Sequence, residues 1–203
     1  MDFAHLIQTV SLYAIPVLLA ITLHEAAHGY AARHFGDNTA YKLGRVTLNP
    51  LPHIDPVGTI LMPLMLYFAT SGAFLFGYAK PVPVRFGNLR NPKRDMIWVA
   101  LAGPGMNLLL TIVTTLAMAG LIIIVPDPQG GLAGLLMENF RNLIVINVML
   151  AIFNLLPIPP FDGSRIVMGI LPAPLARAYG SIERYGLLVV FAILVILPYL
   201  FPE

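Results

Sequence analysis

The chain has 203 residues, of which 58% are hydrophobic and only 11% are charged, and its mean hydropathy is +0.80. Because an average soluble domain carries about 25% charged residues, this composition excludes a soluble globular protein and predicts an integral membrane protein. The net charge is +2 and no basic patch is interleaved with aromatic residues, which argues against nucleic-acid binding. Cysteine is absent, so a metal site would need nitrogen and oxygen ligands.

Five apolar blocks follow one another along the chain, near 7–32, 56–70, 96–125, 139–158 and 182–201. A membrane-spanning helix needs about 20 residues, so four blocks are long enough and 56–70 is marginal. The first block opens with MDFAHLIQ, without a basic region or a cleavage site, and we expect it to stay in the mature protein. We predict an all-α membrane protein: a single integral membrane domain over 1–203, built as a bundle of about four to six transmembrane helices.

Basic residues are confined to a few connections. Eleven of the twelve Lys and Arg residues lie in three loops, at 33–55, 72–95 and 162–184, which the positive-inside rule places in the cytoplasm. The block 56–70 would then have a cytoplasmic loop on each side and should not cross the membrane. We therefore predict a re-entrant excursion over about 56–95: a short helix beginning after Asp55-Pro56, and a return through GYAKPVPVRF as an edge strand or an extended loop.

A metal-binding pattern lies at the end of the first block, where ITLHEAAHGYAARHFG contains His24, Glu25 and His28. Helical spacing puts residues i and i+4 on one face, so both imidazoles can reach one ion while Glu25 projects beside them. In zinc hydrolases such a glutamate is the base that takes a proton from water. The alternative is a chance match, or histidines that hydrogen-bond to another helix. Because ionisable groups are rare inside membrane helices, we favour a metal site.

A third ligand is needed, because catalytic zinc usually takes three protein ligands. Asp162 in PIPPFDGSR is the best candidate, since the prolines break the helix and hold a carboxylate in irregular chain at the membrane boundary. The alternative is an ordinary Asp-Gly turn. If 56–95 does not cross the membrane, Asp162 reaches the same side and depth as the two histidines; a spanning 56–70 would put it on the opposite side. The charge pattern and the metal site thus require the same topology.

At this point the motifs resemble a known family. HEAAH in the first helix, AGPGMN, and NLLPIPPFDG in a later helix resemble the site-2 protease family of intramembrane zinc metalloproteases, over about residues 15–172. GRVTLNPLPHIDPVGT resembles its compact bacterial branch, and the chain shows no PDZ or CBS domain. The resemblance implies one Zn²⁺ per chain, held by His24, His28 and Asp162, with Glu25 as general base. We expect a catalytic core over about 7–172, and the last apolar block predicts a C-terminal transmembrane helix over about 182–201.

The resemblance also implies a substrate and a location. The substrate would be a transmembrane segment of another protein, cut within or near the lipid bilayer, in regulated intramembrane proteolysis. We expect a bacterial cell (inner) membrane, with the active site towards the cytoplasm. No oligomeric state follows from the sequence.

Several other polar or extended positions acquire roles. Relatives keep an asparagine at the position of Asn154 that is thought to steady the oxyanion, although an asparagine there can equally hydrogen-bond across helices. His53 either contacts the site or serves the loop that caps the next helix. Substrate could add as a strand along Lys80 to Phe86, past Val82 and Val84. Two further asparagines read as contacts between helices: Asn107 and Asn147.

Other protein classes fit less well. A rhomboid-type serine protease needs a G-x-S-G serine and a later histidine, whereas ATSG at 69–72 lacks the first glycine. An aspartyl type needs G-x-G-D, which HFGD lacks. Metalloproteases with a glutamate as third ligand need an aspartate four residues later, which neither Glu138 nor Glu183 has. The serious alternative is a membrane metal transporter or metal sensor with the same ligands, for which Glu25 would be superfluous.

Overall fold

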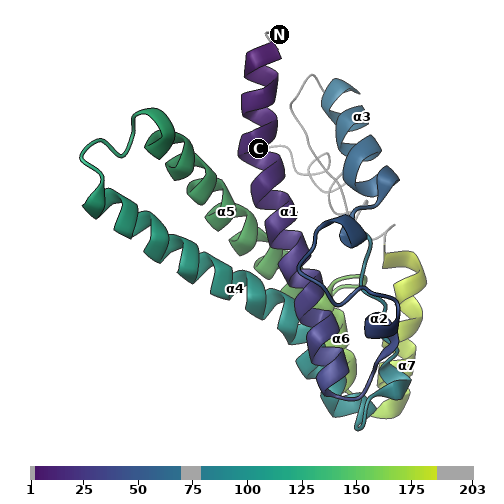
Figure 1. Cartoon of the computed structure of the whole chain (residues 1–203). Coiled ribbons are helices and arrows are strands. Elements are labelled where there is room, and N and C mark those ends of the chain that lie inside the picture. The colour runs from purple at the N-terminus through teal and green to yellow at the C-terminus, as the bar shows by residue number, and fades with distance from the viewer. Residues whose placement is uncertain (1–2, 70–78, 187–203) are drawn as a thin grey trace, which may run out of the picture.

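The computed structural model describes residues 3–69 and 79–186, and all regular elements among them are helical (Figure 1). In chain order they are α1 (Phe3–His34), α2 (Thr39–Lys42), the 3₁₀ turn η1 (Leu51–His53), the π-helical turn η2 (Pro56–Leu61), α3 (Met62–Ala69), the 3₁₀ turn η3 (Phe86–Asn88), α4 (Pro92–Ile124), α5 (Gly131–Leu155), α6 (Asp162–Ile170), α7 (Ala173–Gly180) and the 3₁₀ turn η4 (Ser181–Tyr185). The predicted all-α fold class is confirmed.

Three helices are long and apolar enough to cross a membrane: Leu12–His34 within α1, Pro92–Ile124 and Gly131–Leu155. They match three of the predicted blocks, and the chain is an integral membrane protein. α5 ends directly before the proline-rich stretch, as expected from the donor that proline lacks. The predicted helix over 182–201 falls almost wholly outside the described residues.

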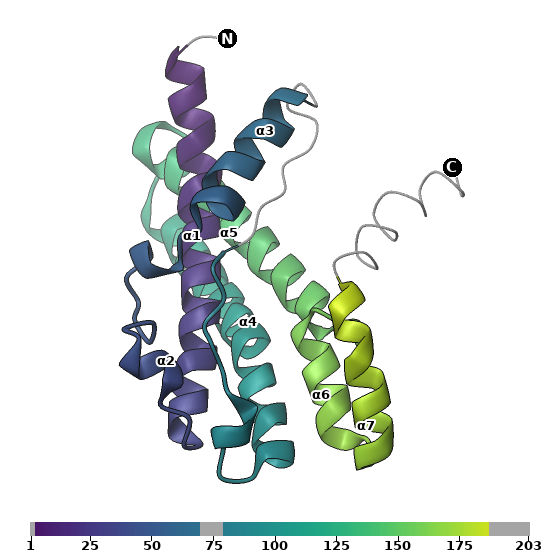
Figure 2. The same ribbon diagram turned by 90° about the vertical axis from the view of Figure 1, so that its right-hand side faces the viewer.

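The three long helices pack against one another (Figures 1 and 2), and small and polar side chains are buried among them. Ala20 and Ala32 of α1 are fully buried, and Gly103 of α4 is buried next to His24 and His28 of α1. Such residues let helix backbones approach closely in a membrane protein. Asn107 of α4 donates a hydrogen bond from Nδ2 to Oδ1 of Asn147 of α5 at 2.8 Å, and both side chains are fully buried. The predicted contact between helices through these asparagines is confirmed.

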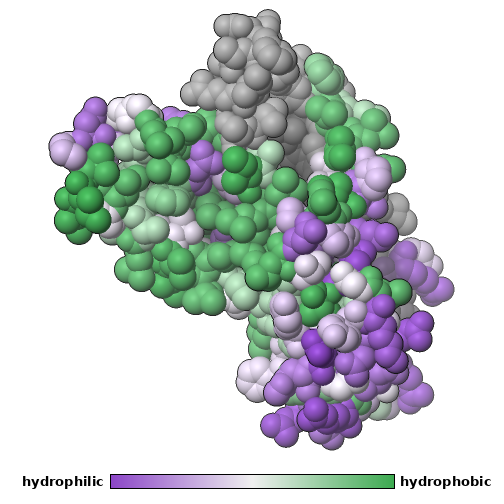
Figure 3. Space-filling model, in the orientation of Figure 1, coloured by the Kyte–Doolittle hydropathy of each residue, from purple (hydrophilic) through white to green (hydrophobic). Residues whose placement is uncertain are grey.

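The outer faces of α4 and α5 are hydrophobic, whereas hydrophilic side chains gather at one end of the molecule, around α2 and the end of α1 (Figure 3). Ile123 and Ile124 of α4 are 83% and 80% exposed, which suits contact with lipid and not with water. Described parts of the three basic loops lie close to one another: Arg90 donates a hydrogen bond to the carbonyl of His34, and α6 packs against α4. They therefore share one side of the bundle, as predicted.

A buried carboxylate ties the first two of these loops together. α1 is followed by Gly36, whose φ of +111° is rarely adopted by other residues, and the chain then turns to Asp37. Asp37 is 1% exposed and accepts hydrogen bonds from the backbone N–H of Arg85 at 2.7 Å, from Asn88 Nδ2 at 3.1 Å, and from Thr39. Burial alone would raise the pKa of Asp37, but these bonds outweigh burial and lower it.

The excursion after α1 leaves and returns at the same place. Asp55 caps its helix, accepting hydrogen bonds from the backbone N–H groups of Val57 and Gly58, so the predicted start after Asp55-Pro56 is confirmed. The helix from Pro56 to Ala69 is about 21 Å long at 1.5 Å per residue, too short for a bilayer core of about 30 Å. The N–H of Lys80 bonds to the carbonyl of His53 at 3.0 Å and so joins the two ends. Among the described residues the return is an extended loop rather than a strand.

The stretch after the prolines differs from the prediction. Asp162 does not lie in irregular chain but is the first residue of α6, which packs against α4. Gly163 permits this turn, because a Cβ there would lie 2.3 Å from the carbonyl oxygen of Leu155. A helix start is favourable for a carboxylate, since the first-turn N–H groups are unpaired.

Candidate metal centre and catalytic cavity

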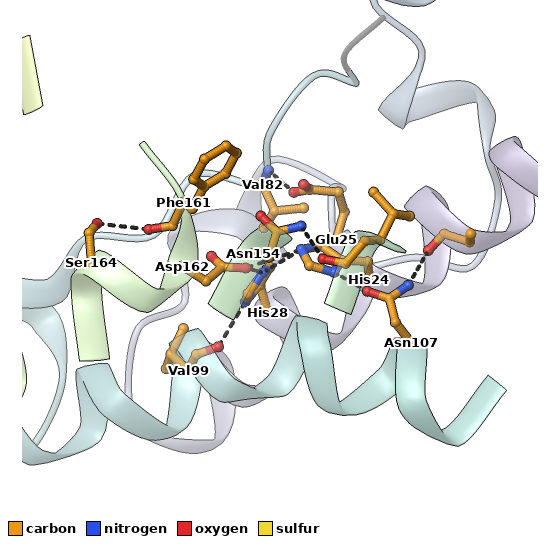
Figure 4. Close-up of polar contacts among 12 residues, drawn as sticks. His24, Glu25, His28, Val82, Val99, Asn107, Asn154, Phe161, Asp162 and Ser164 are labelled. Atoms are coloured by element: carbon orange, nitrogen blue, oxygen red, sulfur yellow. Dashed lines mark hydrogen bonds and ion pairs between the residues drawn. The ribbon is translucent and has the colours of Figure 1, made fainter. Parts of the chain in front are cut away.

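Three ligand atoms converge where α1 meets the start of α6 (Figure 4). His24 and His28 lie one helical turn apart, and their Nε2 atoms are 3.0 Å from each other. Oδ2 of Asp162 lies 3.3 Å from Nε2 of His24 and 3.2 Å from Nε2 of His28. Both histidines are buried and Asp162 is half-buried. The structure thus brings together the three residues that the sequence proposed as ligands.

Hydrogen bonds behind the imidazoles fix which nitrogen faces the centre. Nδ1 of His24 lies 2.6 Å from Oδ1 of Asn107, and Nδ1 of His28 lies 2.7 Å from the carbonyl oxygen of Val99. Both partners are acceptors, so each Nδ1 carries the proton when the ring is neutral, and each Nε2 presents a lone pair. This arrangement is usual for histidines that bind metals.

The residues fit a zinc ion. Two Nε2 lone pairs and a carboxylate oxygen face one another without a proton between them, and Oδ2 of Asp162 is buried with no hydrogen bond of ordinary geometry. A tetrahedral zinc with bonds of about 2.0–2.1 Å holds its ligand atoms about 3.3 Å apart. The observed separations of 3.0 to 3.3 Å match that spacing. A divalent cation would satisfy all three atoms at once.

Asp162 is suited to this position electrostatically. Burial raises its pKa, but the adjacent imidazoles of His24 and His28 outweigh burial and bring the pKa of Asp162 to about 2. The pKa of Asp162 stays low in this way only while one of the two imidazoles carries a positive charge. A metal ion supplies the same charge while both imidazoles stay neutral.

Gly103 of α4 forms the wall behind the ligands. A Cβ added there would lie 2.3 Å from Nε2 of His28 and 2.6 Å from Nε2 of His24. Only a residue without a side chain leaves the ligand atoms and an ion in place. Gly103 and Asn107 are four residues apart on one face of α4, opposite the His24 and His28 pair of α1.

Glu25 lines the same cavity, which has a volume of about 280 Å³. Its Oε2 accepts a hydrogen bond of 2.6 Å from the backbone N–H of Val82, in the extended return of the excursion (Figure 4). Pro81, Val82, Val84 and Phe86 form one wall of this cavity. The carboxylate therefore stands between the metal ligands and an extended chain.

The remaining predicted site residues divide into two groups. Asn154 lines the cavity, and its Nδ2 donates to the carbonyl of Leu150 at 3.0 Å. Val84 also lines it, and the backbone N–H of Val84 has no hydrogen-bond partner within residues 3–69 and 79–186. His53 is not brought to the cavity: it is 1% exposed, and its Nε2 donates to the carbonyl of Thr47 at 3.1 Å.

Comparison with known proteins agrees with this chemistry. Residues 117–197 match the model of peptidase family M50. The chain is 37% identical over 190 residues to a protein of Bacillus subtilis named "Putative zinc metalloprotease YwhC", covering 91% of this chain and 80% of that protein. The chain belongs to peptidase family M50, the site-2 protease family. The M50 peptidase is therefore a zinc-dependent metalloendopeptidase.

Longer relatives match over part of their length. Two proteins named "Putative zinc metalloprotease Rip2", from Mycolicibacterium smegmatis and Mycobacterium tuberculosis, are 29% and 31% identical to this chain. The alignments cover 88% and 84% of this chain but 64% and 61% of those proteins. No solved structure matches the chain significantly.

The sequence missed how α4 of the M50 peptidase completes the centre. Asn107 was expected only to join helices, yet it also orients His24, and Gly103 leaves the space that the ligand atoms occupy. A signal was present in the i, i+4 spacing of Gly103 and Asn107, which repeats the spacing of the histidines. The carbonyl of Val99, which orients His28, left no signal because any residue could supply it.

Proposed function

We propose that this zinc metalloendopeptidase hydrolyses peptide bonds within or near transmembrane segments of other membrane proteins. The observation that carries the proposal is the position of the three candidate metal ligands, His24, His28 and Asp162. Two ligands lie inside a helix that can cross the membrane, and the third joins them from the start of α6. Polar groups within a membrane are costly, and they persist where function needs them. A substrate held in the bilayer can reach this site directly.

His24, His28 and Asp162 would hold one zinc ion, and Glu25 would be the general base. When bound, zinc lowers the pKa of water and polarises the carbonyl of the scissile bond. Glu25 takes the proton of the attacking water and then delivers it to the leaving amide nitrogen. Asn154 lines the same cavity, and its amide would turn from the carbonyl of Leu150 to stabilise the oxyanion.

The substrate must unwind before it is cut, because a helix keeps its carbonyl groups in internal hydrogen bonds. The extended return of the excursion offers such a chain a partner. Val84 lines the cavity, and its backbone N–H has no partner among the described residues, so an unwound substrate could pair with it as an added strand. Main-chain pairing gives affinity with little sequence preference.

The basic end of the bundle sets the proposed orientation. Hydrophilic side chains gather at the end of the molecule around α2 and the end of α1 (Figure 3), where the first basic loop begins, and His24 and His28 lie in the last third of α1. By the positive-inside rule this end faces the cytoplasm of a bacterial cell, so cleavage would occur near the cytoplasmic side of the inner membrane. A reporter fused after α7 would test the orientation directly.

The test uses purified protein with and without the base. Glu25→Gln keeps the size of the side chain but cannot accept a proton. We expect the variant to bind one zinc per chain, as wild type does, and to cut a single-span membrane substrate at least about 10²-fold more slowly. Equal cleavage by both proteins would exclude the assigned mechanism. Restoration of activity by Zn²⁺ after chelation is the matching check on the metal.

A further inference from the structure

The extended return makes one contact with the catalytic group that strand pairing does not explain. We infer that Val82 is a positioning residue for the base: its backbone N–H fixes the Glu25 carboxylate in the cavity and is not a donor to the substrate. The inference rests on the proposed function, because it takes Glu25 as the base. It assigns different roles to Val82 and Val84, which the sequence treated alike.

The contact is specific to one backbone group. Pro81 and Pro83 carry no N–H, so Val82 supplies the only backbone donor of this triplet. That donor lies 2.6 Å from Oε2 of Glu25. Within the described part of the chain it is the only hydrogen bond that the Glu25 side chain makes. One carboxylate oxygen is therefore anchored, and the other is left to exchange protons.

The donor itself is held from both sides. At one end, the guanidinium of Arg45, which is 8% exposed, donates to the carbonyl of Lys80 at 2.7 Å, and the N–H of Lys80 bonds to His53. At the other end, the N–H of Arg85 bonds to the buried carboxylate of Asp37 at 2.7 Å. These residues do not line the cavity, yet they fix the segment that carries Val82. The inference thus gives His53 a supporting position in place of a substrate contact.

Such anchoring matters because Glu25 has three side-chain torsions and must meet the reacting groups in one arrangement. A misplacement of about 1 Å at a catalytic group can slow a reaction by about 10²-fold. Val84 has no comparable task, since its N–H is unpaired in the described structure. The two valines should therefore affect different kinetic constants.

Hydrogen exchange measures the contact without any substrate. In a peptide spanning 79–85 the prolines contribute no amide, so Val82 can be resolved from its few neighbours. We expect slow exchange at Val82 in the zinc-loaded wild type, and exchange at least about 10-fold faster in Glu25→Ala with zinc retained. Asn154→Ala removes another lining residue, whose amide bonds to Leu150 and not to Val82, and should leave this amide slow. Equal rates in wild type and Glu25→Ala, or equal acceleration by Asn154→Ala, would overturn the inference.

Kinetics then separates the two valines. The probe is a synthetic single-span peptide with an Asn-Pro pair in its span and a fluorophore and quencher at its ends. Val82→Pro removes the N–H, and we expect its kcat to be about 10- to 100-fold below that of Val82→Ala, with a similar KM and zinc content. Val84→Pro should instead raise KM. If Val82→Pro raises KM while kcat holds, Val82 is a substrate donor and the inference is wrong. Absence of cleavage by wild type would count against the proposed function, whereas the exchange result would stand.

Discussion

Replacing Gly103 with alanine tests the metal centre where it is most tightly enclosed. The new Cβ would lie 2.3 Å from Nε2 of His28, about 1 Å inside the usual carbon contact distance of about 3.5 Å. The imidazoles cannot turn away freely, because each Nδ1 is held by a hydrogen bond of 2.6 or 2.7 Å. Metal sites tolerate errors of only about 0.2 Å in ligand distance. We therefore expect Gly103→Ala to lose zinc affinity by at least about 10²-fold.

Zinc content per chain, measured on purified protein across a range of free Zn²⁺, reports this loss. Gly105→Ala is the matched control: it lies in the same helix, and its Cβ would meet no atom within 4 Å. Alanine favours a helix over glycine by about 1 kcal/mol, so neither variant should unfold α4. If Gly103→Ala binds zinc and cleaves substrate as wild type does, the ligand geometry described above is wrong.

Two further predictions concern groups around the site. Asn107→Ala removes the acceptor that orients His24, and we expect zinc affinity or activity to fall by about 10- to 100-fold, whereas Asn142→Ala, which removes a bond from α5 to α1, should leave zinc binding unchanged. Zinc titration of both variants distinguishes these outcomes. Asp37→Asn should destabilise the fold by about 1–3 kcal/mol at pH 7, measured by thermal unfolding in detergent. Because folding lowers the pKa of Asp37 below its ordinary 3.8, its ionised form stabilises the fold above about pH 4, and this stabilisation disappears as the pH falls further. The gap between wild type and variant should therefore narrow below pH 4, and a gap that stays constant would contradict the assignment.

The sequence predicted the parts of the site that depend on spacing and topology. The i, i+4 pair of histidines, the proline stop at the end of α5 and the one-sided basic loops together placed Asp162 beside His24 and His28. Each rests on a local rule: helical periodicity, the missing donor of proline, or the preference of positive charge for one side of the membrane. The first two rules act within a few residues and the third acts on the whole chain, so all three can be read from the sequence without knowing which distant segments touch.

The parts that depend on close packing between distant segments were not predictable. The contact of Val82 with Glu25 joins residues 57 positions apart and uses a backbone N–H, so no pattern of side chains in the sequence predicts it. The position of Asp162 at the first residue of α6 was missed because FDGSR reads as a turn, while α6 gains its stability from packing against α4. His53 was a candidate for the site because histidine is a common functional residue, but it is buried and its ring bonds to the carbonyl of Thr47 within its own loop.

The most direct test of the central claim compares the membrane proteins of cells that contain the wild type or Glu25→Gln at equal levels. New protein N-termini, sequenced by mass spectrometry, report each cleavage event. The account predicts N-termini that lie within or beside transmembrane segments, that appear only with the wild type, and that are absent with a zinc-loaded Glu25→Gln. If both proteins yield the same N-termini, or if the wild type cuts only soluble segments far from any membrane span, the assignment of this site to intramembrane proteolysis is wrong.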